Sequence, residues 1–143
     1  MRFALDTSCM VAAVCSWHEQ HPRAAAEVNR RLQARQTLVV PAPALAETYA
    51  VLTRLPPPHR LSPEDALHLV DANFAHGATL VALDAAAYLS VLRRAPDRRV
   101  AGGRIYDAII AQCAIKGRAS CLLTFNERDF AAFVVPDLEI VVP

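Results

Sequence analysis

The sequence predicts an α/β fold: a three-layer sandwich with a central, mainly parallel sheet flanked by helices. Short apolar segments alternate with helical patterns, and these segments carry hydrophobic residues at consecutive positions. Strands of this kind are buried on both faces, as in a parallel sheet that helices cover on each side. The length of 143 residues fits one ordinary domain, so we expect a single domain over residues 1–143.

The expected strands are short and separated by helical segments. They span Arg2–Leu5, Leu38–Val40, Ala78–Leu83, Ser120–Phe125 and Leu138–Val142. The expected helices are one that Thr7 and Ser8 cap and that ends near Val14, then Pro22–Arg35, Pro43–Leu55, Ser62–His76, one beginning at Asp84, and Ile105–Lys116. Folds of this class place their sites beyond the carboxyl ends of the strands, where Asp6 and Asn126 are each expected.

Local signals define several helix ends. Ser62 is a suitable N-cap, Pro63 fits the first helical turn, and the acids at 64 and 65 favour the positive end of the helix dipole. Pro43 likewise suits the first turn of its helix. Gly117 is expected to end the last long helix.

Composition favours a cytoplasmic globular protein that does not enter a membrane. Hydrophobic residues make up 54% of the chain and charged residues 20%. The apolar stretches are far shorter than a membrane helix, and the first of them is too short for a signal-peptide core. The four cysteines form no C-x-x-C pair and are expected to be small buried thiols. The net charge of +1 disfavours a protein that simply coats nucleic acid.

Positive charge is carried almost entirely by arginine. Lys116 is the only lysine, and one short stretch holds five arginines: Arg93, Arg94, Arg98, Arg99 and Arg104. Two interpretations are open. The stretch is a solvated loop and helix end, or it is a rim that contacts phosphate, because the planar guanidinium matches phosphate oxygens.

Three acidic residues stand where a carboxylate is not expected. Asp6 directly follows a buried strand, and Glu47 and Asp107 lie on mostly apolar helices. An unpaired buried carboxylate is normally protonated, paired or bound to metal, and basic residues are scarce in these segments. If the three gather, a cation between them offsets their repulsion. Oxygen ligands favour a hard ion such as Mg²⁺ or Mn²⁺, which can activate water for attack on phosphorus.

Each of these acids also has a simpler interpretation. Asp6 can cap the helix that follows it, and Asp107 can be a first-turn acid favoured by the helix dipole. Glu47 can reach solvent. Convergence of the three is therefore an expectation that only a structure can test.

Four motifs occur in order through nearly the whole chain. They are Phe3-Ala-Leu-Asp-Thr-Ser8, Ala44-Leu-Ala-Glu47, Ile105-Tyr-Asp-Ala-Ile-Ile-Ala111 and Leu123-Thr-Phe-Asn-Glu-Arg-Asp-Phe130. Each alone is unspecific. Together they resemble the PIN domain, and more narrowly the VapC toxins of bacterial toxin–antitoxin pairs.

This resemblance implies an endoribonuclease that uses Mg²⁺ or Mn²⁺ and cleaves structured RNA such as tRNA or rRNA, which inhibits translation and growth. It also implies a homodimer and inhibition by a VapB-type antitoxin. By motif, Asp6 and Asp107 would be the most direct metal ligands. Glu47 would complete the metal's shell or orient a bound water. Such a mechanism needs no histidine base, because the metal lowers the pKa of its water.

The last motif departs from the family's commonest pattern. Many relatives have an acid where this chain has Asn126, and Asp129 follows three residues later. The Asn126 carbonyl can ligate a metal without adding charge, or Asp129 supplies the missing acid; Asp129 is alternatively a turn residue. Thr124 is expected to hold a ligand or a water, and Ser8 is expected to act through Asp6.

The histidines add little to this picture. His18 and His21 are expected in a loop between helices, and their spacing is compatible with a metal pair. We interpret them as surface residues.

Three other functions stay open. A degenerate relative would bind RNA or a partner without cutting it, which the amide of Asn126 motivates; a gain of activity in Asn126→Asp would identify this case. A phosphotransferase with Asp6 as nucleophile is disfavoured, because no second aspartate is nearby and no phosphate-binding glycine loop occurs. A purely structural protein leaves the acids on apolar helices unexplained.

Overall fold

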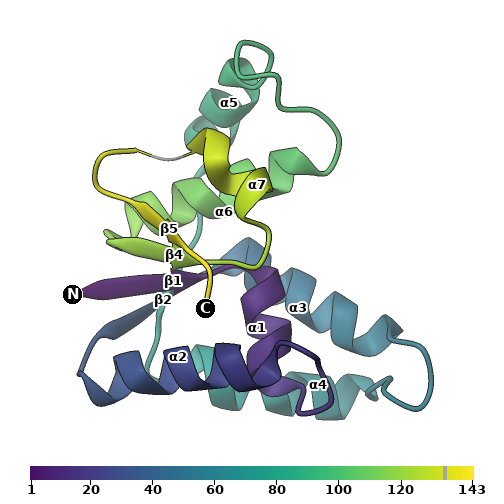
Figure 1. The fold of residues 1–143 in the computed structure, drawn as a ribbon. Coiled ribbons are helices and arrows are strands. Elements are labelled where there is room, and N and C mark those ends of the chain that lie inside the picture. The colour runs from purple at the N-terminus through teal and green to yellow at the C-terminus, as the bar shows by residue number, and fades with distance from the viewer. Residues whose placement is uncertain (134) are drawn as a thin grey trace.

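A parallel sheet of five strands runs through the centre of the molecule (Figure 1). The computed structural model describes residues 1–133 and 135–143. The strand order is β3-β2-β1-β4-β5, and each neighbouring pair is parallel. The strands are Arg2–Leu5 (β1), Thr37–Pro41 (β2), Thr79–Val81 (β3), Cys121–Leu123 (β4) and Glu139–Val141 (β5). The expected mainly parallel sheet is confirmed.

The central strands are buried on both faces. In β1, Phe3, Ala4 and Leu5 are all fully buried, and so are Leu122 and Leu123 in β4. Consecutive apolar residues are therefore needed, because side chains on either face of the sheet meet a layer of helices.

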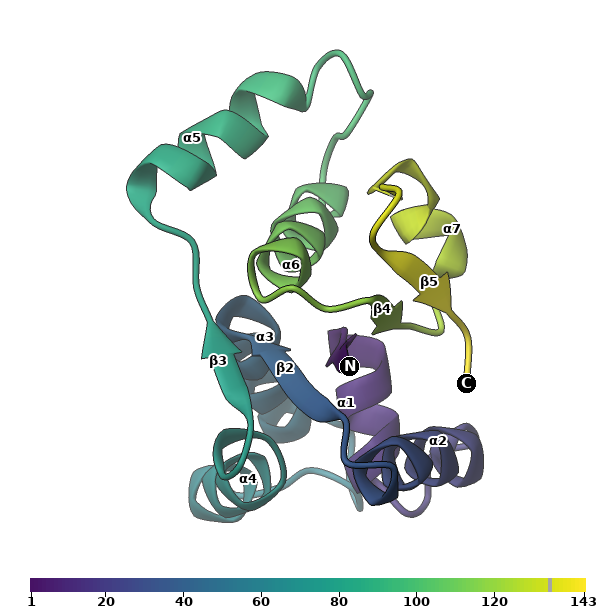
Figure 2. The same cartoon turned by 90° about the vertical axis from the view of Figure 1, so that its left-hand side faces the viewer.

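Helices cover the sheet on both sides (Figures 1 and 2). They are Thr7–Val14 (α1), His21–Gln33 (α2), Ala42–Arg54 (α3), Pro63–Val70 (α4), Ala85–Arg94 (α5), Arg104–Lys116 (α6) and Glu127–Phe130 (α7). In both views α5, α6 and α7 lie on one side of the sheet, and α1, α2 and α4 lie on the other. Helix α3 packs against α1, α4 and α6, so it joins the two layers beside the sheet.

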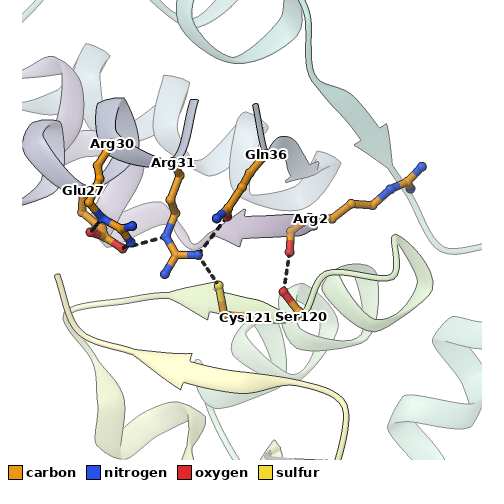
Figure 3. A network of polar contacts seen from close by, with 7 residues as sticks. All are labelled: Arg2, Glu27, Arg30, Arg31, Gln36, Ser120 and Cys121. Atoms are coloured by element: carbon orange, nitrogen blue, oxygen red, sulfur yellow. Dashed lines mark hydrogen bonds and ion pairs between the residues drawn. The ribbon is translucent and has the colours of Figure 1, made fainter. Parts of the chain in front are cut away.

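A buried arginine holds α2 against the sheet (Figure 3). The Arg31 guanidinium donates to Glu27 Oε1 at 2.7 Å, to Gln36 Oε1 at 3.1 Å and to Cys121 Sγ at 3.0 Å. Its carbon lies 5.6 Å from the centre of the Phe3 ring. Cys121 is on β4, so one side chain ties the helix to the middle of the sheet.

Several expected helix ends are confirmed. Ser62 accepts from the Asp65 backbone N–H at 3.1 Å, and Asp84 accepts from the Ala87 N–H at 2.8 Å. Of the residues considered as the cap of α1, the structure has Asp6, which accepts from the Cys9 N–H, rather than Thr7 or Ser8.

The segments expected to follow β4 and α4 are also different. The fourth strand ends at Leu123, so Asn126 lies in a loop and not at the strand end. The short helix α7 and the 3-10 turn Ala131–Phe133 were not expected. The helix expected up to His76 changes to a π-helical turn over Asp71–Ala75.

Gly117 follows α6 as expected, but for another reason. Its φ is −75°, so no left-handed backbone is required. A Cβ at this position would meet Val39 Cγ1 at 2.5 Å and Val81 Cγ2 at 3.1 Å. Glycine is needed here because the end of α6 touches the sheet.

The structure also bears on the expected state of the cysteines and on the expected absence of a membrane-spanning helix. All four cysteines are free and buried, as expected. Among the described residues, no helix combines the length and apolar character that crossing a membrane requires.

Candidate active site

An open pocket of about 410 Å³ lies where β1 and β4 end, between α1, α3 and α6. Its lining comprises Asp6, Thr7, Ser8, Val11, His18, Glu47, Val51, Asp107, Ile110, Phe125 and Asn126. The carboxyl edge of a parallel sheet is where α/β proteins usually bind ligands. The structure thus brings the three singled-out acids and Asn126 to one cavity.

Asp6 is the most firmly held of these acids. It is 2% exposed, and its carboxylate accepts from Thr124 Oγ1 at 2.5 Å, from Ser8 Oγ at 2.7 Å and from the Cys9 N–H at 2.9 Å. Thr124 and Ser8 therefore orient Asp6, which agrees with the expectation for Ser8. The cap interpretation of Asp6 is correct, and it does not compete with a place in the pocket.

The same hydroxyls fix the loop that carries Asn126. Thr124 Oγ1 accepts from the Asn126 N–H at 2.9 Å, and Ser8 Oγ accepts from the Phe125 N–H at 3.1 Å. The start of α1 and the loop after β4 are therefore one hydrogen-bonded unit around Asp6.

The environment of Asp6 disfavours its charge despite these donors. Burial is the main cause that raises the pKa of Asp6, and the nearby Glu47 carboxylate raises it further; the bonds from Thr124, Cys9 and Ser8 act in the opposite direction. A carboxylate in this position is stabilised by a nearby cation.

Asp107 lies in the first turn of α6 and is half-buried. Its pKa is raised to about 6, mainly by burial and further by the carboxylates of Asp129, Asp6 and Glu47. The positive charge of Arg104 acts against them. The first-turn interpretation of Asp107 is correct, but the side chain also faces like charges.

Glu47, Asn126 and Asp129 complete the polar surroundings. Glu47 is exposed on α3 and still lines the pocket, so it reaches solvent there. Asn126 precedes α7 and makes no side-chain cap. Asp129 is on α7, outside the lining of the pocket as described, and it is near enough to raise the pKa of Asp107.

The donor set suits a hard cation better than any other group. The polar lining is dominated by carboxylate, amide and hydroxyl oxygens, which Mg²⁺ and Mn²⁺ prefer. Repulsion among the carboxylates, together with the burial of Asp6, indicates that positive charge would stabilise the pocket. Within residues 1–133 and 135–143, however, no three side chains of His, Cys, Asp or Glu form a ready metal-binding group. The oxygen atoms of the lining are therefore chemically suited to such an ion.

The pocket contains polar residues that sequence reasoning did not select. Thr7 is buried, and its Oγ1 has no hydrogen-bond partner among the described residues. His18 forms part of the wall, whereas the Nδ1 of His21, the first residue of α2, lies 2.8 Å from the Ala12 carbonyl oxygen. The two histidines are therefore not a pair. Thr7 could have been found from its place beside Asp6, whereas His18 is considered from the sequence only as one half of a metal pair with His21 and is interpreted as a surface residue.

The arginine stretch divides between two environments. Arg93, Arg94, Arg98 and Arg99 are exposed, and Arg94 and Arg98 line a separate cavity of about 60 Å³. Arg104 is half-buried at the start of α6, and its Nε has no partner among the described residues. Of these five arginines, Arg104 lowers the pKa of Asp107.

A family model and several solved structures match this chain and its fold. The PIN domain family model matches residues 3–134. Solved structures share the fold: VapC20 from Mycobacterium tuberculosis, a sarcin–ricin-loop-cleaving toxin, has a TM-score of 0.70 at 17% identity and covers 93% of this chain and 96% of its own. VapBC2 from Rickettsia felis, bound to a DNA fragment from its promoter, has a TM-score of 0.69 at 21% identity. The match covers 99% of this chain and 98% of the other.

Two proteins with similar sequences are ribonucleases of the VapC type. Ribonuclease VapC40 from Mycobacterium tuberculosis is 40% identical over 125 residues, which are 87% of this chain and 87% of that protein. Ribonuclease VapC27 from the same organism is 34% identical over 116 residues, which are 81% of this chain and 79% of that protein. The chain belongs to the PIN domain family and, within it, to the VapC ribonucleases.

Proposed function

We propose that this protein is a metal-dependent endoribonuclease and the toxin of a toxin–antitoxin pair. It cleaves structured cellular RNA such as tRNA or rRNA, and this inhibits translation and growth. One observation carries the proposal: in a member of the VapC family, Asp6, Glu47 and Asp107 line a single pocket at the carboxyl edge of the sheet.

In this proposal Asp6 and Asp107 are the direct ligands of Mg²⁺ or Mn²⁺. Glu47 completes the ion's shell or orients a water. If bound there, such an ion would supply a water of lowered pKa and offset the charge that develops on the phosphate during cleavage. Thr124 and Ser8 hold Asp6 in place, and the exposed Asn126 supplies an oxygen at the rim. Asp129 acts on Asp107 through space and adds negative charge beside it.

The proposed partners are a VapB-type antitoxin and a second copy of the chain. Several structures with this fold are complexes of VapB and VapC proteins, among them VapBC from Salmonella typhimurium and VapBC-1 from nontypeable Haemophilus influenzae. Exposed leucines on α4 and α5, namely Leu67, Leu89 and Leu92, offer apolar surface for such contacts. Action on cellular RNA places the protein in the cytoplasm.

The decisive test compares two acid-to-amide variants with a matched control. Asp6→Asn and Asp107→Asn should each lower cleavage of total cellular RNA in Mg²⁺ or Mn²⁺ by at least about 100-fold, because each removes a ligand charge. Asp84→Asn should leave cleavage unchanged, since asparagine retains the cap of α5. Circular dichroism should show that all three remain folded. Wild-type protein that binds Mn²⁺ and its antitoxin yet cuts no RNA would contradict the proposal.

A second candidate is a relative that binds RNA without cutting it. The amide of Asn126 at the pocket favours this candidate, because it adds no charge where many relatives have an acid. Titration of Mn²⁺ into wild type and Asn126→Asp separates the two. Tighter metal binding with new cleavage in the variant alone supports the second candidate, whereas cleavage by wild type removes it.

A further inference from the structure

Three aromatic rings gather beside the acidic pocket. Trp17 stacks on His59, with ring centres 4.1 Å apart and an angle of 18° between the rings. His18 meets Trp17 at 5.9 Å and 44°. Trp17 and His18 belong to the loop between α1 and α2, and His59 belongs to the loop between α3 and α4. We call these three residues the ring cluster.

His18 connects the ring cluster to the pocket. It belongs to the pocket wall together with Asp6, Glu47 and Asp107, while its ring also contacts Trp17. The Gln20 N–H donates to His18 Nδ1 at 3.0 Å. A ring nitrogen that accepts a hydrogen bond carries no proton, so this bond places the ring N–H on Nε2. His18 therefore presents one N–H donor with its orientation fixed by the backbone.

Trp17 is exposed although its ring stacks on another ring. The side chain is 45% exposed even though its ring stacks on that of His59. A large apolar ring held this way offers a surface for stacking, and little conformational freedom is lost when a ligand binds. No other part of the mechanism uses this ring.

We propose that the ring cluster is a binding subsite for an unpaired nucleobase of the RNA, next to the bond that is cleaved. The base stacks on Trp17, and His18 Nε2–H donates to the base edge or the adjoining phosphate. The inference rests on the proposed ribonuclease function. Stacking requires a base that is free of its own helix, so the subsite selects loops or bulges over continuous duplex.

A purely structural role of the ring cluster predicts different results. In that case the stack ties two loops together, and RNA does not change the surroundings of Trp17. The chain has one tryptophan, so selectively excited fluorescence reports on this ring alone.

The first experiment uses the full chain with Asp6→Asn, so that RNA binds without being cut. The probes are a fluorescently labelled stem-loop RNA and a fully paired duplex with the same stem. Anisotropy of the label measures binding, and Trp17 emission measures stacking. We expect the stem-loop to quench Trp17 in proportion to binding, and the duplex to bind more weakly with little quenching. Binding of the stem-loop without any change in Trp17 emission overturns the inference.

The second experiment separates stacking from loop packing. Trp17→Ala should weaken stem-loop binding and raise the KM for its cleavage by about 5- to 150-fold, the range for loss of one base–aromatic stack, with a smaller effect on kcat. Trp17→Phe should recover most of the loss. Tyr88→Ala removes an aromatic ring of similar exposure from α5, outside the pocket, and should change neither quantity.

Failure of the subsite and failure of the function give different patterns. Equal KM values for wild type, Trp17→Ala and Trp17→Phe overturn the subsite and leave the ribonuclease intact. Wild-type protein that neither binds nor cuts either RNA overturns both.

Discussion

At the scale of single residues, Thr124 decides how Asp6 is presented. Its hydroxyl is fully buried, donates to Asp6 Oδ2 and accepts from the Asn126 N–H. One side chain therefore orients the buried acid and also fixes the start of the loop that carries Asn126.

Replacing Thr124 by valine should remove both hydrogen bonds at nearly constant volume. We expect a loss of stability of about 1–3 kcal/mol, because Asp6 loses a donor in a buried site. RNA cleavage should fall roughly 10- to 100-fold, as is typical when the group that orients a metal ligand is removed. Thr124→Ser should recover most of both. Urea unfolding and initial cleavage rates measure the two effects, and normal cleavage by the valine variant would contradict this role of Thr124.

The sequence located the acids but left their arrangement open. Asp6, Glu47 and Asp107 stand out because they interrupt apolar segments, and all three line the pocket. His18 is interpreted from the sequence as a surface residue, since its place in the pocket wall depends on where a loop folds back and no local pattern encodes that position. The alternatives for Asp6 also turned out to be compatible: one carboxylate caps α1 and faces the pocket.

At the scale of secondary-structure elements, the contact between α6 and the sheet limits the residue at position 117. Gly117→Ala places a Cβ against Val39 and Val81, so we expect a loss of about 1–3 kcal/mol from overpacking. Gly103→Ala is the matched control, because its Cβ meets nothing within 4 Å and its φ is −62°. Thermal unfolding should separate the two variants. Equal Tm values would mean that the sheet adjusts to the extra methyl group.

The Glu27–Arg31 pair should make the docking of α2 sensitive to acid. Hydrogen bonds from Arg30, and from Arg31, lower the pKa of Glu27 from 4.5 to about 2. A lowered pKa in the folded state gives stability that is complete above 4.5 and is lost as the pH falls towards 2. Glu27→Gln should cost about 1–2 kcal/mol at neutral pH, mainly because the buried Arg31 loses its charged acceptor.

Measuring the unfolding free energy at several pH values provides the control for this effect. The difference in unfolding free energy between wild type and Glu27→Gln should shrink from pH 4.5 to pH 2, since wild type then protonates Glu27. Arg30 is exposed, so Arg30→Gln should cost less than Glu27→Gln. A difference that stays constant through this range would exclude Glu27 as its source.

Element boundaries could be predicted where a local signal exists. Ser62 and Asp84 cap their helices by side-chain bonds that the sequence encodes directly. Helix α7 was missed because it has only four residues and no capping side chain. The π-helical turn after α4 continues a helical pattern, so sequence periodicity does not distinguish it.

At the scale of the whole molecule, the sheet places like charges together, so the proposed metal binding should raise the stability of the fold. Folding brings Asp6, Glu47 and Asp107 into one pocket, where burial and mutual repulsion raise the pKa values of both aspartates. An ion that binds only the folded chain stabilises it by mass action. At about 100 times its Kd, Mn²⁺ should add about 2.7 kcal/mol, which raises Tm by roughly 5–10 °C in a domain of this size.

The Mn²⁺-dependent rise in Tm, measured in variants, also tests where the ion binds. Asp6→Asn and Asp107→Asn should largely abolish the Mn²⁺-dependent rise in Tm, and both should be more stable than or equal to wild type when chelator removes the ion, because each relieves repulsion between carboxylates. For Asp6 the gain is offset where the new amide meets the donors Ser8 and Thr124, so Asp107→Asn is the clearer case. Asp84→Asn should keep the full rise, because Asp84 caps α5 outside the pocket. An equal rise in all four proteins would place the ion elsewhere and remove the physical basis for gathering three acids at this edge of the sheet.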